Sequence, residues 1–231
     1  MLCVGTALFG MFFFLTIFVQ AVWGYSALRS GVAHLPMMAA IMAMSAASAQ
    51  LVPRIGARPL LIAESATATG GMFWLSRISE HSHYTTGLLG PALVAGAGLG
   101  MLFMPLSLVA LSRVQADVAG AASSLLNAGQ QVGGSIGLAV LGTVAWTAVA
   151  NSIRSQSAAA AARASRPAQH AAGGLPTAIY RHALATGFSR AFEVSAGILL
   201  LALVITIAAI RIPRAGLAGA QGPARQGPPG A

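Results

Sequence analysis

Glu64 is an acidic residue that lies inside an otherwise apolar stretch of the sequence, residues 59–76. A charged carboxyl group among apolar residues is costly, and by default such a group in a membrane span binds a proton or contacts a cation. Glu64 also lies about a turn and a half from Arg58 on a helix. It can instead reach back to that end of the stretch and pair with an arginine. The sequence leaves both interpretations of Glu64 open.

A second group of residues lies between positions 119 and 137, where small and uncharged polar side chains are mixed. Gly129, Gly133 and Gly137 recur every four residues, so on a helix they share one face and let another helix approach closely. Uncharged polar side chains beside them are costly against lipid and should face protein or a watery cavity. We interpret the stretch as a helix-packing surface or as a gate, and the two roles are compatible. The predicted members are Asn127, Gly129, Gln130, Gln131, Gly133, Gly134 and Gly137.

The remaining reactive residues form no strong pattern. Glu80, His81 and His83 resemble a metal cluster faintly, and a solvated loop explains them better. The sequence contains a single cysteine, Cys3, which excludes an intrachain disulfide and a cysteine metal site. It contains no nucleophile motif, no paired carboxylates and no zinc signature. We therefore expect no enzyme activity, no cofactor and no metal site.

The composition identifies the medium that must surround these residues. Of the 231 residues, 56% are hydrophobic and 7% are charged, whereas soluble domains carry about 25% charged residues. The mean hydropathy is +0.76. The 13 basic residues are all arginines scattered between apolar stretches, which is typical of the ends of membrane spans and not of a nucleic-acid surface. The chain is predicted to be an all-α integral membrane protein that binds no nucleic acid.

Hydropathy predicts one transmembrane bundle of six helices over residues 1–212. A crossing needs about 20 mostly apolar residues, and six stretches meet this requirement approximately. The stretch rich in Ala, Ser and Arg before the last span, residues 151–187, is predicted to be a long loop. The Gly- and Pro-rich residues 213–231 are predicted to be a disordered tail. The predicted spans are residues 1–22, 34–52, 59–76, 86–111, 118–150 and 191–210.

The distribution of arginines predicts the orientation in the cell membrane. An even number of spans places both termini on the same side. Arg54 and Arg58 lie in a tight turn, and Arg211 and Arg214 lie directly after the last span. Because arginines in short loops and near span ends favour the cytoplasmic side, we expect both termini in the cytoplasm.

Aromatic and methionine side chains are concentrated in the first and fourth predicted spans. They either contact lipid and fill the core, or form an apolar wall for flat, lipophilic substrates, because Met and Phe adapt to varied shapes. Gln20 is the polar exception near the end of the first span. The predicted cavity residues are Phe14, Phe18, Gln20, Met101, Phe103 and Met104.

Three segments of the sequence resemble the C-terminal half of a major facilitator superfamily transporter, from the fourteen-span drug:proton antiporter branch. They are GYSALRSG at 24–31, LVPRIGARPLL at 51–61 and AGAASSLLNAGQQVGGSIGLAVLGT at 119–143. In the second segment Arg54, Gly56 and Arg58 match the cytoplasmic loop motif of the family. Pro53 stands where the family usually has an acidic residue.

The resemblance implies a six-helix bundle that pairs with a second one and works by alternating access. It implies that the first and fourth spans line a cavity, while the second and fifth face the partner bundle. It also implies export of lipophilic drugs or metabolites across the lipid bilayer by proton antiport. The partner bundle would be an N-terminal half, which usually carries the proton-coupling acid and is not in this sequence, or a second copy. The alternative is a non-transporting membrane fragment or accessory bundle that needs a partner half.

Overall fold

The computed structural model describes residues 1–111, 114–115, 117–163 and 177–209, with backbone alone for 160–163 and 209. Within these residues the chain is almost entirely helical and contains no strand. The predicted all-α fold is therefore confirmed. The helices are α1 (Leu2–Ile17), α2 (Ala27–Ile55), α3 (Ala57–Leu75), α4 (Gly90–Leu111), α5 (Ala119–Arg163) and α6 (Thr177–Ala209). Single π-helical turns extend α1 at Phe18–Val22 and precede α4 at Tyr84–Leu89.

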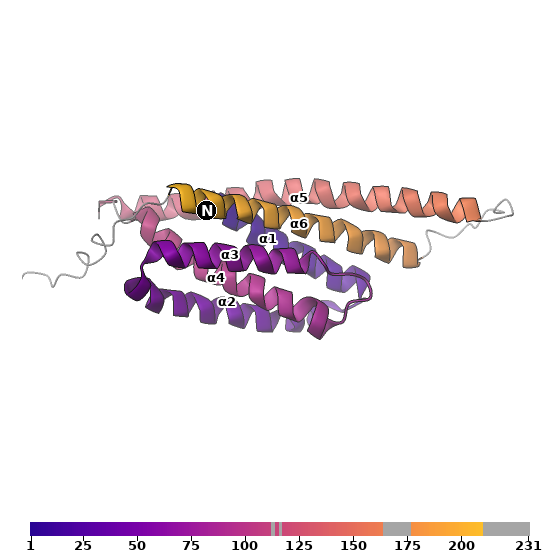
Figure 1. The fold of residues 1–231 in the computed structure, drawn as a ribbon, viewed down its shortest axis with the longest axis horizontal. Helices are drawn as coiled ribbons and strands as arrows, with labels where there is room; N and C mark the ends of the chain where they lie inside the picture. Colours follow the sequence, from indigo (N-terminus) through magenta and orange to yellow (C-terminus); the bar gives the residue numbers. More distant parts are fainter. Residues whose placement is uncertain (112–113, 116, 164–176, 210–231) are drawn as a thin grey trace, which may run out of the picture.

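The six helices lie side by side along one long axis (Figure 1). They alternate in direction, so the first residue of α1 and the last described residues of α6 lie at the same end of the bundle. Five segments are long and apolar enough to cross a membrane by length and composition: residues 2–22, 27–55, 84–111, 119–159 and 177–208. Helix α3 is not among these five. It lies alongside the others in the bundle, and its crossing stays a prediction.

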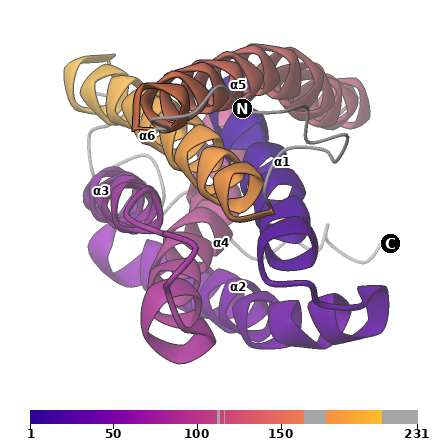
Figure 2. The same ribbon diagram turned by 90° about the vertical axis from the view of Figure 1, so that its right-hand side faces the viewer.

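The helices form two groups of three. Helices α1, α5 and α6 pack against one another, and α2, α3 and α4 form the other group. The main contact between the groups is that of α3 with α6. Viewed along the bundle, α1 lies on one side between α5 and α2 (Figure 2). Helices α1 and α4 are the most enclosed of the five crossing segments, whereas α2 is largely exposed.

Local sequence explains where α2 begins and ends. The Ser26 side chain accepts a hydrogen bond from the backbone N–H of Arg29 and so caps the first turn. At the other end Gly56 has φ +86°, a conformation that favours glycine. Helix α3 starts directly after it, which makes the tight turn predicted from the sequence. Helix α2 begins seven residues before the predicted span at 34–52 because the cap, and not the change in hydropathy, sets its start.

The predicted loop at residues 151–187 is wrong for most of its length. Helix α5 continues to Arg163, and residues 177–187 form the first turns of α6. Residues 151–163 are rich in Ala, Arg, Ser and Gln, and Ala, Arg and Gln favour helix whether or not lipid surrounds them. Loss of hydropathy therefore marks the end of the apolar segment and not the end of the helix. Residues 164–176 and the predicted tail 213–231 lie outside the described residues.

Helix α5 extends past the rest of the bundle (Figure 1). Its 45 residues correspond to a length of about 67 Å at 1.5 Å per residue. A bilayer core is about 30 Å thick. The crossing segment predicted at 118–150 is therefore the first part of a longer helix whose C-terminal part projects.

Candidate functional site

The carboxyl group of Glu64 lies at a junction of three helices. The Glu64 side chain is fully buried within α3. The Ser48 hydroxyl of α2 donates a hydrogen bond of 2.9 Å to Glu64 Oε1 and lies 3.0 Å from the Met101 carbonyl oxygen of α4. Glu64 Oε2 is buried and has no hydrogen-bond partner among the described residues. We call Ser48, Glu64 and the Met101 carbonyl the three-helix junction.

Glu64 does not pair with Arg58, which was one of the two interpretations of its position. No ion pair to Glu64 is found within the described part of the chain. Arg58 instead donates a hydrogen bond of 3.1 Å to the Ile207 carbonyl near the end of α6. This contact joins the first turn of α3 to the last turn of α6. Of the other motif residues, Arg54 is exposed and Gly56 makes the turn between α2 and α3.

The predicted cavity residues of α1 differ in their burial. Phe14 and Phe18 are fully buried, and the Phe14 ring packs 5.6 Å from Phe188 and 6.4 Å from Phe192 of α6. Their prediction as cavity residues is therefore wrong, because they fill the core between α1 and α6. Gln20 is exposed, and its role as a cavity residue stays a prediction.

An exposed aromatic face of α1 was not predicted. Phe9 and Phe13 are 39% and 46% exposed, and their spacing of four residues places them on one side of the helix. On α4, Met101 and Phe103 are half-buried and Met104 is 38% exposed. The periodicity of residues 9, 13 and 20 was the available signal in the sequence. Because nearly every residue of α1 is apolar, this signal could not be separated from the buried face.

The glycines of α5 pack against α1 of the same chain. A Cβ atom at Gly133 would overlap the backbone of Leu2, at Gly134 the Phe9 ring, and at Gly137 the Thr6 side chain. The Thr6 hydroxyl also donates a 2.7 Å hydrogen bond to the Gly133 carbonyl. The prediction that these three glycines face a partner bundle is wrong, because α1 occupies that face. The alternative role as a helix-packing surface describes them correctly.

Other members of the predicted interface point elsewhere. Asn127 and Gln131 are exposed, whereas Gly129 and Gln130 are half-buried. Exposed apolar residues lie together on a neighbouring part of the exposed side of α5, namely Leu125, Val132, Ile136 and Val140. This exposed face, and not the glycine face, is the part of α5 available to a partner.

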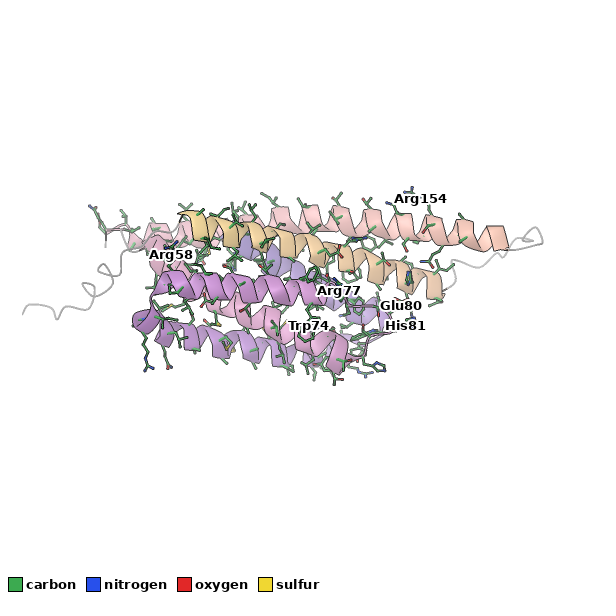
Figure 3. The ribbon with its side chains drawn as sticks, in the orientation of Figure 1. Arg58, Trp74, Arg77, Glu80, His81 and Arg154 are labelled. Carbon is green, nitrogen blue, oxygen red and sulfur yellow. The ribbon has the colours of Figure 1, made fainter. Side chains whose placement is uncertain are left out.

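A cluster of polar side chains lies at the end of the bundle opposite Arg58 (Figure 3). Glu80, in the connection between α3 and α4, accepts a hydrogen bond of 2.6 Å from His182 Nδ1 of α6. His81 Nε2 lies 3.6 Å from the same carboxylate oxygen. The Ser189 hydroxyl of α6 donates to the Ser76 carbonyl, directly after the last residue of α3. Glu80, His81 and Tyr84 border an open pocket of about 370 Å³. Together these contacts hold α6 against the connection.

The electrostatics of Glu80 follow from these neighbours. Partial burial alone raises the pKa of the Glu80 carboxyl. The hydrogen bond from His182 and the charges of His182 and His81 outweigh this effect and hold the pKa below its ordinary value of 4.5. No group of three potential ligands suited to a metal ion is found within the described residues. The contacts of the cluster join α6 to the α3–α4 connection.

The lowered pKa of Glu80 predicts how stability changes in acid. A carboxyl group with a lowered pKa stabilises the fold above its ordinary pKa, and this contribution is lost as the pH falls through the lowered value. We expect the Glu80→Gln protein to lose less stability than the original protein between neutral pH and about pH 3. Thermal unfolding in detergent micelles across this range measures the difference. Glu193→Gln is the control, since it removes a carboxylate whose pair with Arg190 is exposed, and an equal effect of both variants would contradict the prediction.

The long apolar helices and the buried polar contacts between them define a multi-pass helical membrane protein. Residues 1–138 match the family model described as Major Facilitator Superfamily. This match covers more than half of the chain. The chain therefore belongs to the major facilitator superfamily, whose members are membrane transporters.

Three curated relatives are similar over part of the chain. The puromycin resistance protein pur8 of Streptomyces alboniger is 39% identical over 146 residues, which cover 62% of this chain and 29% of the relative. The cephamycin export protein CmcT of Amycolatopsis lactamdurans is 38% identical over 148 residues, covering 62% and 30%. The multidrug resistance protein Stp of Mycobacterium tuberculosis is 37% identical over 142 residues, covering 61% and 26%. The predicted resemblance to drug exporters of this superfamily is confirmed, and the matched regions span less than a third of each relative.

Proposed function

We propose that this chain is the C-terminal six-helix part of a transporter that exports lipophilic drugs or metabolites by proton antiport. The observation that carries the proposal is the similarity to three proteins named for resistance or export. The relatives' names mention puromycin and cephamycin, which are the first substrates to test. The proposed transport requires no catalytic residue in this chain.

The side chains of α1 and α4, the two most enclosed of the crossing helices, support an apolar substrate. Neither α1 nor α4 contains a charged residue. The exposed face of α1 carries Phe9 and Phe13, and the exposed face of α4 carries Met104 and Leu108. Such side chains adapt to flat, lipophilic molecules. A polar nutrient would instead need charged or hydrogen-bonding groups at these positions.

The exposed faces of α2 and α5 support pairing with a second six-helix half. Helix α2 is largely exposed in this structure. Helix α5 exposes Gln131 as well as apolar residues such as Val132 and Ile136, and an amide group is costly against lipid. A second half that covers both helices would enclose the side of the bundle on which α1 lies (Figure 2). Rocking of the two halves would then open this side alternately to each face of the membrane.

The proposed orientation follows from the end of the bundle that carries Arg54 and Arg58. Both arginines lie at the short turn between α2 and α3, and arginines in short loops favour the cytoplasmic side. The Glu80 and His182 cluster at the opposite end would then face outward. The N-terminus of the chain would be cytoplasmic in this arrangement.

A chimeric transporter tests the proposed function. Residues 1–138 of this chain would replace the matching segment of the puromycin resistance protein, which supplies all other spans. We expect cells that make the chimera to accumulate less puromycin than cells with an empty vector, and dissipation of the proton gradient to abolish the difference. Normal insertion of the chimera with full puromycin accumulation would instead favour the alternative, a non-transporting fragment or accessory bundle.

A further inference from the structure

Pro105 changes the hydrogen bonding of α4 one turn earlier. In an α-helix the carbonyl of residue 101 accepts from the N–H of residue 105, but proline has no N–H. Pro105 lies inside α4 and is buried. The Ser48 hydroxyl of α2 takes the place of the missing donor, 3.0 Å from the Met101 oxygen. The sequence of α4 therefore creates an acceptor that a neighbouring helix must satisfy.

The same hydroxyl group also serves Glu64. Ser48 is fully buried, and its Oγ lies 2.9 Å from Glu64 Oε1. A serine hydroxyl has one hydrogen to donate and can accept from other groups. A backbone carbonyl only accepts, so Ser48 satisfies the Met101 oxygen fully only when it donates there. Its contact with Glu64 is then a hydrogen bond only if Glu64 is the donor, and a glutamate side chain donates only when protonated.

Loss of the proton from Glu64 changes this arrangement. An ionised carboxylate accepts hydrogen bonds and donates none, and an unsatisfied buried charge is more costly than an unsatisfied neutral carbonyl. The Ser48 hydrogen then turns to Glu64 Oε1, and the Met101 carbonyl loses its donor. When the Glu64 carboxylate binds a proton from water, the exchange is reversed. When the carboxyl group ionises, the proton returns to water.

We propose that Glu64 is a proton-binding site that controls, through Ser48, whether a hydrogen bond joins α2 to α3 or to α4. When Glu64 is protonated, Ser48 stays bound to the Met101 carbonyl in the turn of α4 before Pro105. When Glu64 is ionised, this hydrogen bond is lost. Because α4 is one of the two central helices, the state of one proton is coupled to the helix that borders the proposed substrate path. This coupling rests on the proposed function, but proton binding at Glu64 is measurable without transport.

The titratable side chains on the helices around Glu64 do not pair with its carboxyl group in the described part of the chain. Helix α4 contains no titratable side chain, and those of α2 are Arg29, His34 and Arg54. On α3 the remaining one is Arg58, about 9 Å away along the helix axis and bound to α6. Helix α6 carries Tyr180, Arg181, His182, Arg190 and Glu193, all between its start and its middle, whereas Arg58 contacts its last turn at Ile207. None of these side chains forms an ion pair with Glu64 within the described part of the chain.

Infrared difference spectroscopy of the full chain in lipid vesicles tests the proposal. A protonated carboxyl group gives a carbonyl band that an ionised one lacks, and the chain has four acidic residues to assign. We expect such a band near neutral pH, its loss in Glu64→Gln, and its retention in Glu80→Gln. Absence of the band from about pH 5 to about pH 9, or its persistence in Glu64→Gln, would overturn the proposal.

A second variant tests the role of Ser48 separately. In Ser48→Ala the protonated carboxyl loses its acceptor, so the band should remain but shift to higher frequency. Ser195→Ala is the matched control, because Ser195 is buried and has no hydrogen-bond partner among the described residues. A band of unchanged frequency in Ser48→Ala would show that Ser48 does not contact the protonated acid. Neither result depends on whether the chain transports anything.

Discussion

Replacing Gly133 by alanine is expected to destabilise the protein by about 1–3 kcal/mol, the usual cost of excess volume in a packed interface. The added Cβ would lie 2.6 Å from the Leu2 Cα and would overlap the Leu2 carbonyl oxygen. Backbone atoms cannot turn away as a side chain can. Helices α1 and α5 must therefore separate, which also lengthens the hydrogen bond from Thr6 to the Gly133 carbonyl. Thermal unfolding of the purified protein in detergent measures the loss.

Gly142 provides the matched control on the same helix. A Cβ atom there would meet nothing within 4 Å, and alanine favours helix over glycine by up to about 1 kcal/mol. Gly142→Ala should therefore leave stability unchanged or raise it slightly. If Gly133→Ala were as stable as Gly142→Ala, the close packing of α1 against α5 would be wrong.

Replacing Phe14 by alanine is expected to cost about 3–5 kcal/mol of stability, as is typical for removal of a buried aromatic ring. The Phe14 ring is fully enclosed and contacts Phe188 and Phe192 of α6. Its removal leaves a cavity between α1 and α6. The free energy of unfolding from denaturant titration in mixed micelles measures this effect.

Phe13, the next residue, separates core packing from substrate contact. Its ring is 46% exposed, so Phe13→Ala should cost less than about 1 kcal/mol. Under the proposed function this variant should nevertheless alter export, because Phe13 lies on the exposed face of α1. Equal destabilisation by the two variants would contradict the assignment of Phe14 to the core and Phe13 to the surface.

The sequence predicted the helical membrane fold because hydropathy depends on composition over whole segments. It could not predict the helix ends where helix-forming residues continue beyond the apolar segment, as at residues 151–163. It also could not assign the buried face of α1. In an amphipathic helix periodicity marks that face, but in α1 nearly every position is apolar.

The sequence identified residues of the candidate site, but it did not identify the residues that they contact. The spacing of Gly133 and Gly137 correctly indicated a close approach of two helices. The partner, α1, lies more than 120 residues earlier in the chain, and spacing within one helix carries no information on it. The position of Glu64 within an apolar segment of the sequence marks it as unusual. Its contact with Ser48 depends on the packing of α2 against α3 and α4, and on Pro105 within α4.

The grouping of α1 with α5 and α6 has a consequence for the order of synthesis. Helices α2, α3 and α4 are consecutive, so they can pack together as soon as they leave the ribosome. Helix α1 is synthesised before α5 and α6 and must wait for both before its buried face, including Thr6 and Phe14, is covered. Contacts between distant parts of a chain form late, and the surfaces that wait for them are exposed to aggregation. Of these six helices, α1 is therefore the one whose packing depends most on helices that are synthesised much later.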